Sequence, residues 1–336
     1  MPDALPPELR RRRGRQIALA LAVGALATVL ALLAVTPAPA GSRPTCSGEP
    51  ADYIGGPGNN TLTGTRGRDV IVGGGGNDTI DGRGGNDDLC GGNGADTIYG
   101  GTGKDFGYGE AGRDYVIGDR ASDPVAGQND LLNGGAGGDN VFGQGGDDII
   151  QGESAGEVAG ADVVGGGYGA DLVIGRAGAD FAGGGPGTDR VLAGDGPDCA
   201  VGEQGPDKVY GEGGNDTVLG LQGNDLVDGG AGEESSFYVS PAGCTNGGVY
   251  GDGAFGGTSP GDGDDEVRGG PGDDNNIYGA GGSDHLFGDD GEDDLDGGDG
   301  VDFGNGGAPG DAFPGNTSDD DPDFCGTESE VNCTGD

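Results

Sequence analysis

The sequence has no tryptophan, one methionine and one histidine, and aromatic residues make up 5% of its 336 residues. Hydrophobic residues reach 32%, whereas an average globular domain is about 45–50% apolar. The chain is long enough for about two domains, but its apolar content is too small to fill two conventional cores. The single histidine also leaves no His-rich zinc motif, and no two cysteines have Cys-x-x-Cys spacing.

Basic residues are scarce as well. Lysine and arginine together number 16 against 59 aspartates and glutamates, which gives a formal net charge of −43. Nucleic acid is therefore excluded as a partner, because its phosphates would be repelled. A metal cation is the partner that this charge favours.

Glycine is the residue in excess, with 86 positions against 18 for proline. The glycines do not fall at every third position, so the sequence is not that of a collagen. The excess predicts a chain rich in tight turns.

The N-terminus has the order of an export signal. Arginines at 10–13 and 15 precede an apolar run over 17–35, and Ala38-Pro39-Ala40 follows it. This order predicts a secretory signal peptide over residues 1–40, cleaved before Gly41. The alternative is an uncleaved membrane anchor, because the run is long enough to span a bilayer. In both cases the arginines keep the N-terminus inside, so the remainder is secreted or extracellular.

The cysteines all lie in the part of the chain that follows the signal. They are even in number, which in an oxidising compartment predicts disulfides whose pairing the sequence leaves open. We expect one local bridge, Cys325–Cys333, in the C-terminal tail 315–336. The six residues are Cys46, Cys90, Cys199, Cys244, Cys325 and Cys333.

A nine-residue repeat begins at Gly55. Seven units follow one another without insertion as far as Ile117, from GGPGNNTLT and GTRGRDVIV to GEAGRDYVI. Glycine occupies positions one and four, an acid position six, and an aliphatic residue position eight. We place the repeats at 55–314, after a short segment 41–54, with interruptions near 118–124, 152–156 and 229–259.

The position-six aspartates are the candidate metal ligands. Asn60 holds this position in the first unit, which we expect to be a cap because terminal repeats are atypical. Asp130, Asp265 and Asp311 lie beside interruptions, and their role stays open. The candidates are Asp69, Asp78, Asp87, Asp96, Asp105, Asp114, Asp139, Asp148, Asp162, Asp171, Asp180, Asp189, Asp198, Asp207, Asp216, Asp225, Asp274, Asp284, Asp293 and Asp302.

The unit has a physical explanation. Glycine permits positive φ and close approach, so the first six residues form a turn that aims carbonyl oxygens and the carboxylate at one point. Such hard oxygens suit Ca²⁺, which takes six to eight of them at about 2.3–2.6 Å. The last three residues form a short strand whose middle side chain points inward. Every second turn then stacks on the same edge, so an ion between stacked turns draws one aspartate from each.

The fold predicted from this unit is all-β, a parallel β-roll or β-solenoid. One aliphatic side chain per unit recovers less free energy than ordering nine residues costs, and the aspartates repel one another. Ca²⁺ binding would supply the missing free energy. We therefore expect the exported chain to be disordered without Ca²⁺ and β-rich with it.

The nonapeptide GGxGxDxUx resembles the repeat of the RTX, or haemolysin-type calcium-binding, family over residues 55–314. The resemblance implies a β-roll with stacked calcium sites, whose ligands are the position-six aspartates and turn carbonyls. Many family members carry a C-terminal export signal and a catalytic or pore-forming domain. This sequence has an N-terminal signal and only 41–54 ahead of the repeats, as in stand-alone secreted bacterial members.

The predicted function is therefore non-enzymatic: a structural, adhesion or matrix protein outside the cell, with calcium ions as partners. A first alternative is capture of a partner by the interruption 229–259, which holds Phe237, Tyr238 and Tyr250. A second alternative is a serine hydrolase using the Ser154 or Ser259 of a G-x-S-x-G pattern. No following helix fits the repeat, and His285, the one possible base, falls at position seven of a unit.

Overall fold

The computed structural model describes residues 43–119, 127–153, 159–231, 248–250, 264–272, 274–279, 281–291 and 293–307, and the strands at 312–313, 324–325 and 332–333. The chain divides into two units, Met1–Arg43 and Pro44–Asp336. The first unit, with the predicted signal peptide, lies almost wholly outside the described residues. Among the described residues no helix is long and apolar enough to cross a bilayer.

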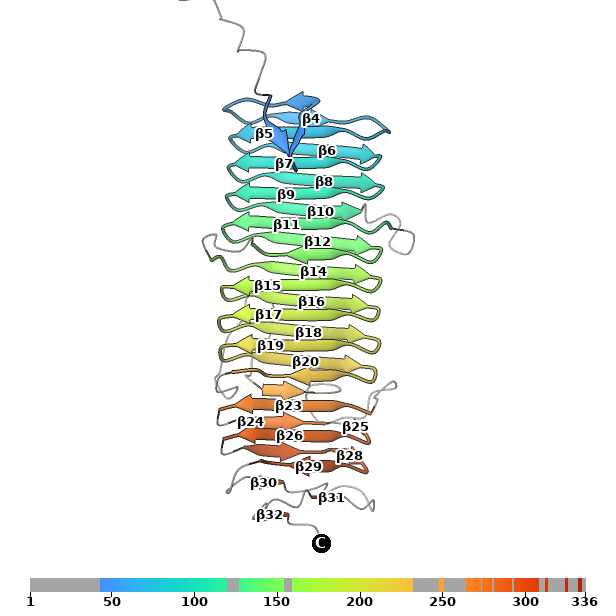
Figure 1. The fold of residues 1–336 in the computed structure, drawn as a ribbon, viewed down its shortest axis with the longest axis vertical. Helices are drawn as coiled ribbons and strands as arrows, with labels where there is room; N and C mark the ends of the chain where they lie inside the picture. Colours follow the sequence, from blue (N-terminus) through green and yellow to red (C-terminus); the bar gives the residue numbers. More distant parts are fainter. Residues whose placement is uncertain are drawn as a thin grey trace, which may run out of the picture. The chain divides into compact units, whose positions relative to one another are not determined.

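The second unit is built from strands that alternate between two parallel sheets of 14 strands each (Figure 1). This confirms the predicted parallel β-roll. The first sheet contains β3 (Tyr53–Ile54), β5 (Val70–Gly75), β7 (Asp88–Asn93), β9 (Phe106–Ala111), β11 (Leu131–Ala136), β13 (Ile149–Gln151), β15 (Leu172–Ala177), β17 (Arg190–Asp195), β19 (Lys208–Gly213), β21 (Leu226–Asp228), β23 (Glu266–Pro271), β26 (His285–Asp290), β29 (Phe303–Asn305) and β31 (Phe324–Cys325).

The second sheet has the same parallel stacking. It contains β4 (Thr61–Thr63), β6 (Thr79–Gly84), β8 (Thr97–Thr102), β10 (Tyr115–Asp119), β12 (Asn140–Gly145), β14 (Val163–Tyr168), β16 (Phe181–Pro186), β18 (Cys199–Gln204), β20 (Thr217–Gln222), β22 (Gly248–Tyr250), β24 (Asn275–Tyr278), β27 (Asp294–Asp296), β30 (Ala312–Phe313) and β32 (Asn332–Cys333). A small separate sheet pairs β25 (Gly281–Gly282) with β28 (Asp299–Gly300).

Two repeat units make one coil, so each residue pairs with the residue one coil further along. In uninterrupted units the partner has the same frame position, as in Thr61↔Thr79 and Val70↔Asp88. The pairs Tyr115↔Asn140 and Asn140↔Val163 span the first two interruptions and still join position seven to position seven. The inserted residues therefore leave the register unchanged.

The strands are longer than the three residues predicted. A typical strand such as β6 runs over six residues, from position seven of one unit to position three of the next. The first three positions of a unit pair as well, because backbone hydrogen bonds need no side chain. The predicted interruption 229–259 likewise contains a paired strand, β22, which lies between β20 and β24.

The core is a single column of position-eight side chains between the sheets. Ile80, Leu89, Ile98 and their counterparts in later coils are fully buried. Gly107 and Gly304 hold this position without a side chain, and a Cβ on Gly107 would lie 2.9 Å from Val116 Cγ1 and 3.0 Å from Leu132 Cδ2. The neighbouring side chains therefore occupy the space that Gly107 leaves.

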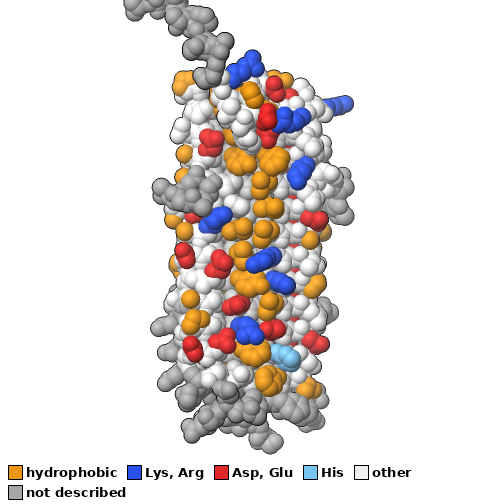
Figure 2. Space-filling view, viewed as in Figure 1, with side chains coloured by type: hydrophobic (Ala, Val, Ile, Leu, Met, Phe, Trp, Pro, Cys, Tyr) orange, Lys and Arg blue, Asp and Glu red, His pale blue; other side chains and the backbone are white. Residues whose placement is uncertain are grey.

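The outer faces of the sheets carry positions seven and nine. On the first sheet these side chains include a ladder of apolar residues, Phe106, Leu131, Ile149 and Leu172, paired from strand to strand. Figure 2 shows hydrophobic side chains in a stripe along one face of the stack.

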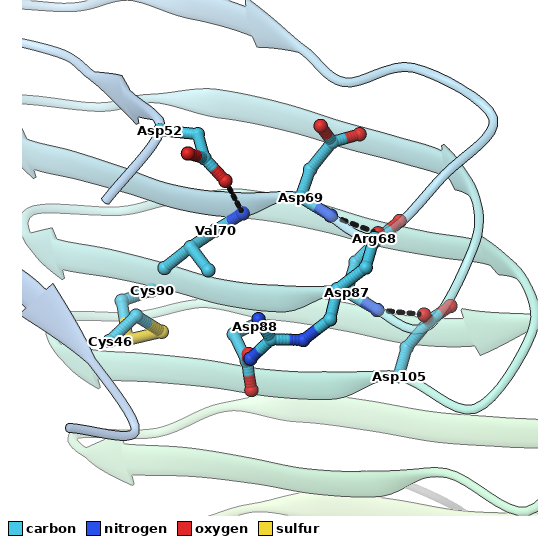
Figure 3. A network of polar contacts seen from close by, with 9 residues as sticks. All are labelled: Cys46, Asp52, Arg68, Asp69, Val70, Asp87, Asp88, Cys90 and Asp105. Atoms are coloured by element: carbon cyan, nitrogen blue, oxygen red, sulfur yellow. Dashed lines mark hydrogen bonds and ion pairs between the residues drawn. A yellow bond between two sulfur atoms is a disulfide. The ribbon is translucent and has the colours of Figure 1, made fainter. Parts of the chain in front are cut away.

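A short hairpin covers the beginning of the first sheet. It pairs β1 (Thr45–Cys46) with β2 (Glu49–Pro50), and Cys46 forms a disulfide with Cys90 of β7 (Figure 3). Cys199 is also disulfide-bonded, to a cysteine whose side chain lies outside the described residues. The side chains of Cys325 and Cys333 lie outside them too, so that local bridge stays a prediction.

Candidate metal sites

The turns of the roll depend on two backbone positions with positive φ. Position four is left-handed and is glycine in most units, for example Gly85 with φ 131°. Position two is left-handed as well, even where it is not glycine, as in Arg83 (φ 74°) and Glu203 (φ 84°). The sequence did not reveal this second position, because varied residues occupy it.

Position one is glycine in the described units apart from Ala193, and the space for a side chain there is small. A Cβ on Gly82 would lie 2.6 Å from Asp87 Oδ2 and 2.6 Å from the carbonyl oxygen of Gly100 in the next coil. The same pair of oxygens faces Gly202, at 2.7 Å for Asp207 Oδ2 and 2.8 Å for the Gly220 oxygen. A carboxylate oxygen of the same unit and a backbone carbonyl oxygen of the next coil therefore both lie close to the position-one glycine, and hard oxygens of these two kinds are ligands that Ca²⁺ prefers.

The position-six residues form two hydrogen-bonded ladders, one on each edge of the roll. In both, the backbone N–H of one residue donates to Oδ1 of the aspartate one coil later, as Asp69 does to Asp87 and Asp87 to Asp105 (Figure 3). The first ladder contains Asp69, Asp87, Asp105, Asp130, Asp148, Asp171, Asp189, Asp207, Asp225, Asp265, Asp284 and Asp302. The second contains Asn60, Asp78, Asp96, Asp114, Asp139, Asp162, Asp180, Asp198 and Asp216, and later Asp274 and Asp293.

The other carboxylate oxygen of these aspartates has no hydrogen-bond partner. Among the described residues, Oδ2 of every position-six aspartate from Asp78 to Asp302 is buried and unpartnered. A buried, unpaired carboxylate oxygen is costly unless a cation or a proton accompanies it. The two ladders therefore fit a series of cations held between coils by oxygen ligands.

Burial also makes these carboxylates hard to ionise. It raises the pKa of Asp87 to about 6, that of Asp105 to about 7 and that of Asp130 to about 9, against hydrogen bonds from the backbone that lower it. A cation beside each carboxylate would favour the ionised form instead. The raised pKa values of these aspartates thus result from their burial in the roll.

The first coil differs from those that follow it. Asn60 Oδ1 accepts a hydrogen bond from the Gly56 N–H of its own turn. Asp69 Oδ2 accepts from the N–H and the hydroxyl of Thr65, at 2.6 and 2.9 Å. Of the aspartates predicted as ligands, Asp69 is therefore the one whose second oxygen already has partners.

The structure brings all the predicted aspartates into the ladders, and Asp130 and Asp265 with them. Asp311 lies outside the described residues, as do Ser154 and Ser259. His285 lies at the start of β26 and makes an edge contact with the Phe303 ring, with centroids 5.7 Å apart.

The sequence analysis missed two acids, Asp119 and Glu153, which are 4% and 3% exposed. Each follows a glycine that lies at position one, because a Cβ on Gly118 or Gly152 would be 2.2 Å from Oδ2 of Asp130 or Asp162. Both acids therefore occupy position two, immediately before an insertion. Aligning each break between positions two and three would have identified them.

Comparison with curated proteins finds no match. The family model for the RTX calcium-binding nonapeptide repeat matches residues 54–89, 91–123, 126–154, 165–198, 200–233, 261–275 and 272–304. These matches cover more than half of the chain and most of the roll. The chain therefore belongs to the RTX calcium-binding nonapeptide repeat family.

Proposed function

We propose that the protein is a secreted calcium-binding protein whose roll folds when Ca²⁺ enters the two ladders. The observation that carries this proposal is the series of buried Oδ2 atoms without a hydrogen bond, many of which lie near a carbonyl oxygen of the next coil. Bound calcium would neutralise the carboxylates. Its binding free energy would then contribute to folding, because the sites exist only in the coiled chain.

The residues that would hold the ions come from successive coils. A position-six aspartate such as Asp207 supplies a carboxylate oxygen, and a position-one residue one coil further, here Gly220, supplies a carbonyl. The 20 aspartates predicted from the sequence, together with Asp130 and Asp265, are the proposed carboxylate ligands. Asp69 is the weakest of them because Thr65 already occupies its Oδ2.

The proposed setting is outside the cell, in a structural, adhesion or matrix role. The arginines at 10–13 and 15, the apolar run 17–35 and Ala38-Pro39-Ala40 support export. Extracellular calcium-binding modules work with dissociation constants of about 10⁻⁴–10⁻³ M. A roll with weak individual sites would thus fill and fold after export.

Circular dichroism of the purified protein during a calcium titration tests this function. In chelator-stripped buffer we expect a disordered far-UV spectrum, which becomes β-rich as Ca²⁺ is added. Magnesium is the matched control, because it demands near-ideal octahedral geometry and dehydrates reluctantly. A spectrum that is already β-rich and does not change with calcium would contradict the proposal.

A further inference from the structure

Glu153 differs from every other glutamate at position two of a unit. Glu110, Glu203 and Glu212 occupy the same position, have left-handed backbones (φ 73°, 84° and 70°) and are exposed. Glu153 is 3% exposed. One residue type at one frame position thus takes two opposite orientations.

The insertion that follows accounts for this difference. Glu153 is not among the described residues with a left-handed backbone, since position three, Ala159, follows only after five inserted residues. Its side chain therefore lies against the turn of the next coil, where the Ala177 N–H donates to Oε1 at 3.2 Å. Oε2 is buried and has no hydrogen-bond partner.

This unpartnered oxygen lies beside two consecutive members of the second ladder. Glu153, Asp162 and Asp180 each place a carboxylate oxygen so that the three lie within 4.8 Å of one another. The Asp162 N–H donates to Asp180 Oδ1 at 2.8 Å, which leaves Oδ2 of both aspartates buried and unpartnered. The carbonyl oxygen of Gly175 also lies near Asp162 Oδ2, because a Cβ on Gly152 would be 2.6 Å from the first and 2.2 Å from the second.

Arg176 is the nearest positive charge, but no described ion pair joins it to Glu153. Its guanidinium donates to Gln151 Oε1 at 3.3 Å, while its Nε is buried without a partner. Three carboxylates therefore lie close together, and the guanidinium near them donates a hydrogen bond to Gln151 instead. A proton shared between Glu153 and Asp162 is the competing explanation for their proximity.

We propose that Glu153, Asp162 and Asp180 form a three-carboxylate cation site that binds one Ca²⁺ more tightly than the two-aspartate positions elsewhere in the roll. This inference rests on the proposed function, of which it singles out one position. Calcium affinity rises with the number of charged ligands. For the same reason, a trivalent lanthanide of similar size should enter this position first.

Calcium competition against a chromophoric chelator tests the site on the purified protein. In the wild type we expect the first equivalent of Ca²⁺ to bind more tightly than the rest. Glu153→Gln should weaken that first equivalent by about 10- to 100-fold, a range typical when a group that supports a metal site is lost. Glu203→Gln is the matched control, with the same frame position and an exposed side chain, and should leave it unchanged.

A second measurement locates the ion. Crystals grown with one equivalent of Tb³⁺ should show an anomalous peak between Glu153, Asp162 and Asp180, and spectra at saturating Ca²⁺ should show that Glu153→Gln still folds. The proposal is overturned if Glu153→Gln and Glu203→Gln bind the first equivalent alike, as a shared proton would require, or if the peak lies elsewhere. If calcium binds with equal affinity at all positions, this inference fails and the proposed function stands; if no calcium binds, both fail.

Discussion

The same aspartate ladders run through two kinds of coil. One kind is uninterrupted, between Asp162 and Asp225, and the other has insertions after Asp119 and Glu153. The Asp105 N–H reaches Asp130 Oδ1 across an insertion at 2.8 Å, the distance found between Asp171 and Asp189 without one. The difference lies at position two, which is left-handed in uninterrupted units and holds a buried acid before an insertion. The comparison teaches that inserted residues are accommodated between positions two and three of a unit. Their structural effect is local to position two.

Burial disfavours charge in both kinds of coil, and most strongly at Asp130 beside the first insertion. The pKa is raised to about 9 for Asp130 and to about 8 for Asp148 and Asp162, beside the insertions. In uninterrupted units it is raised to about 6 for Asp171 and Asp180, to about 7 for Asp189, Asp198 and Asp207, and to about 8 for Asp216. Burial is the main cause in each case, and Asp119 adds repulsion at Asp130 and Asp148. Of these carboxylates Asp130 has the highest pKa, so its ionised form depends most on a compensating cation.

The largest expected effect is that of pH on the calcium-free protein. The folded-state pKa values lie above the ordinary aspartate value of about 3.9, so the folded chain binds protons more tightly than the unfolded one. This stabilisation is complete below about pH 4 and is lost as pH rises through about 6 to 9. In calcium-free buffer the β-rich far-UV circular dichroism signal should therefore be strongest near pH 4 and be lost as the pH rises to 9, in agreement with the disorder expected without Ca²⁺ at neutral pH.

Two aspartate variants test this pH profile separately in an interrupted coil and in an uninterrupted one. Asp130→Asn removes the carboxylate with the higher pKa and should flatten the profile above pH 7, whereas Asp171→Asn should act nearer pH 6. A β-rich signal that grows between pH 5 and pH 8 in calcium-free buffer would show that burial does not govern these groups.

The next largest effect is expected from Gly202→Ala in an uninterrupted unit. The new Cβ would lie 2.7 Å from Asp207 Oδ2 and 2.8 Å from the Gly220 oxygen, which is a backbone atom. We expect a loss of about 1–3 kcal/mol in the free energy of unfolding, as for other overpacked sites. Urea denaturation at saturating Ca²⁺ measures it.

Gly58→Ala provides the control for this substitution, because a Cβ on Gly58 meets nothing within 4 Å. Equal stability of the two variants would mean that position one is not spatially restricted. Gly118→Ala tests whether the interrupted coil has the same spatial restriction. It should lower the free energy of unfolding by as much as Gly202→Ala.

The smallest effect is expected from deleting residues 120–126. The deletion joins Asp119 directly to Gly127 and restores an uninterrupted unit, so Asp119 would take the left-handed backbone of other position-two residues. We expect a loss of about 1 kcal/mol, the cost of that backbone for a residue with a Cβ. Adding Asp119→Gly should restore the stability, and unfolding of both proteins in urea compares them. A deletion that prevents folding would show that the insertion helps to set the register.

The nine-residue period was sufficient to predict the coil, the core column and the aspartate edges, because each is a residue type at a fixed position. Three features escaped it for physical reasons. Left-handed position two holds residues as different as Arg83 and Leu221, so composition conceals its backbone. The Cys46–Cys90 bridge depends on a hairpin that folds back onto β7. The burial of Glu153 depends on the insertion that begins directly after it, between positions two and three of the unit.

The aspartate ladders run in one sense only, since each backbone N–H points to the carboxylate of the coil that follows. The molecule therefore has a beginning, where Asn60 and Asp69 are satisfied within their own turns, and a direction of growth. Duplicating any pair of neighbouring units would supply an acceptor to the coil before it and a donor to the coil after it. Such a molecule can lengthen in evolution by whole coils, with no compensating substitution elsewhere.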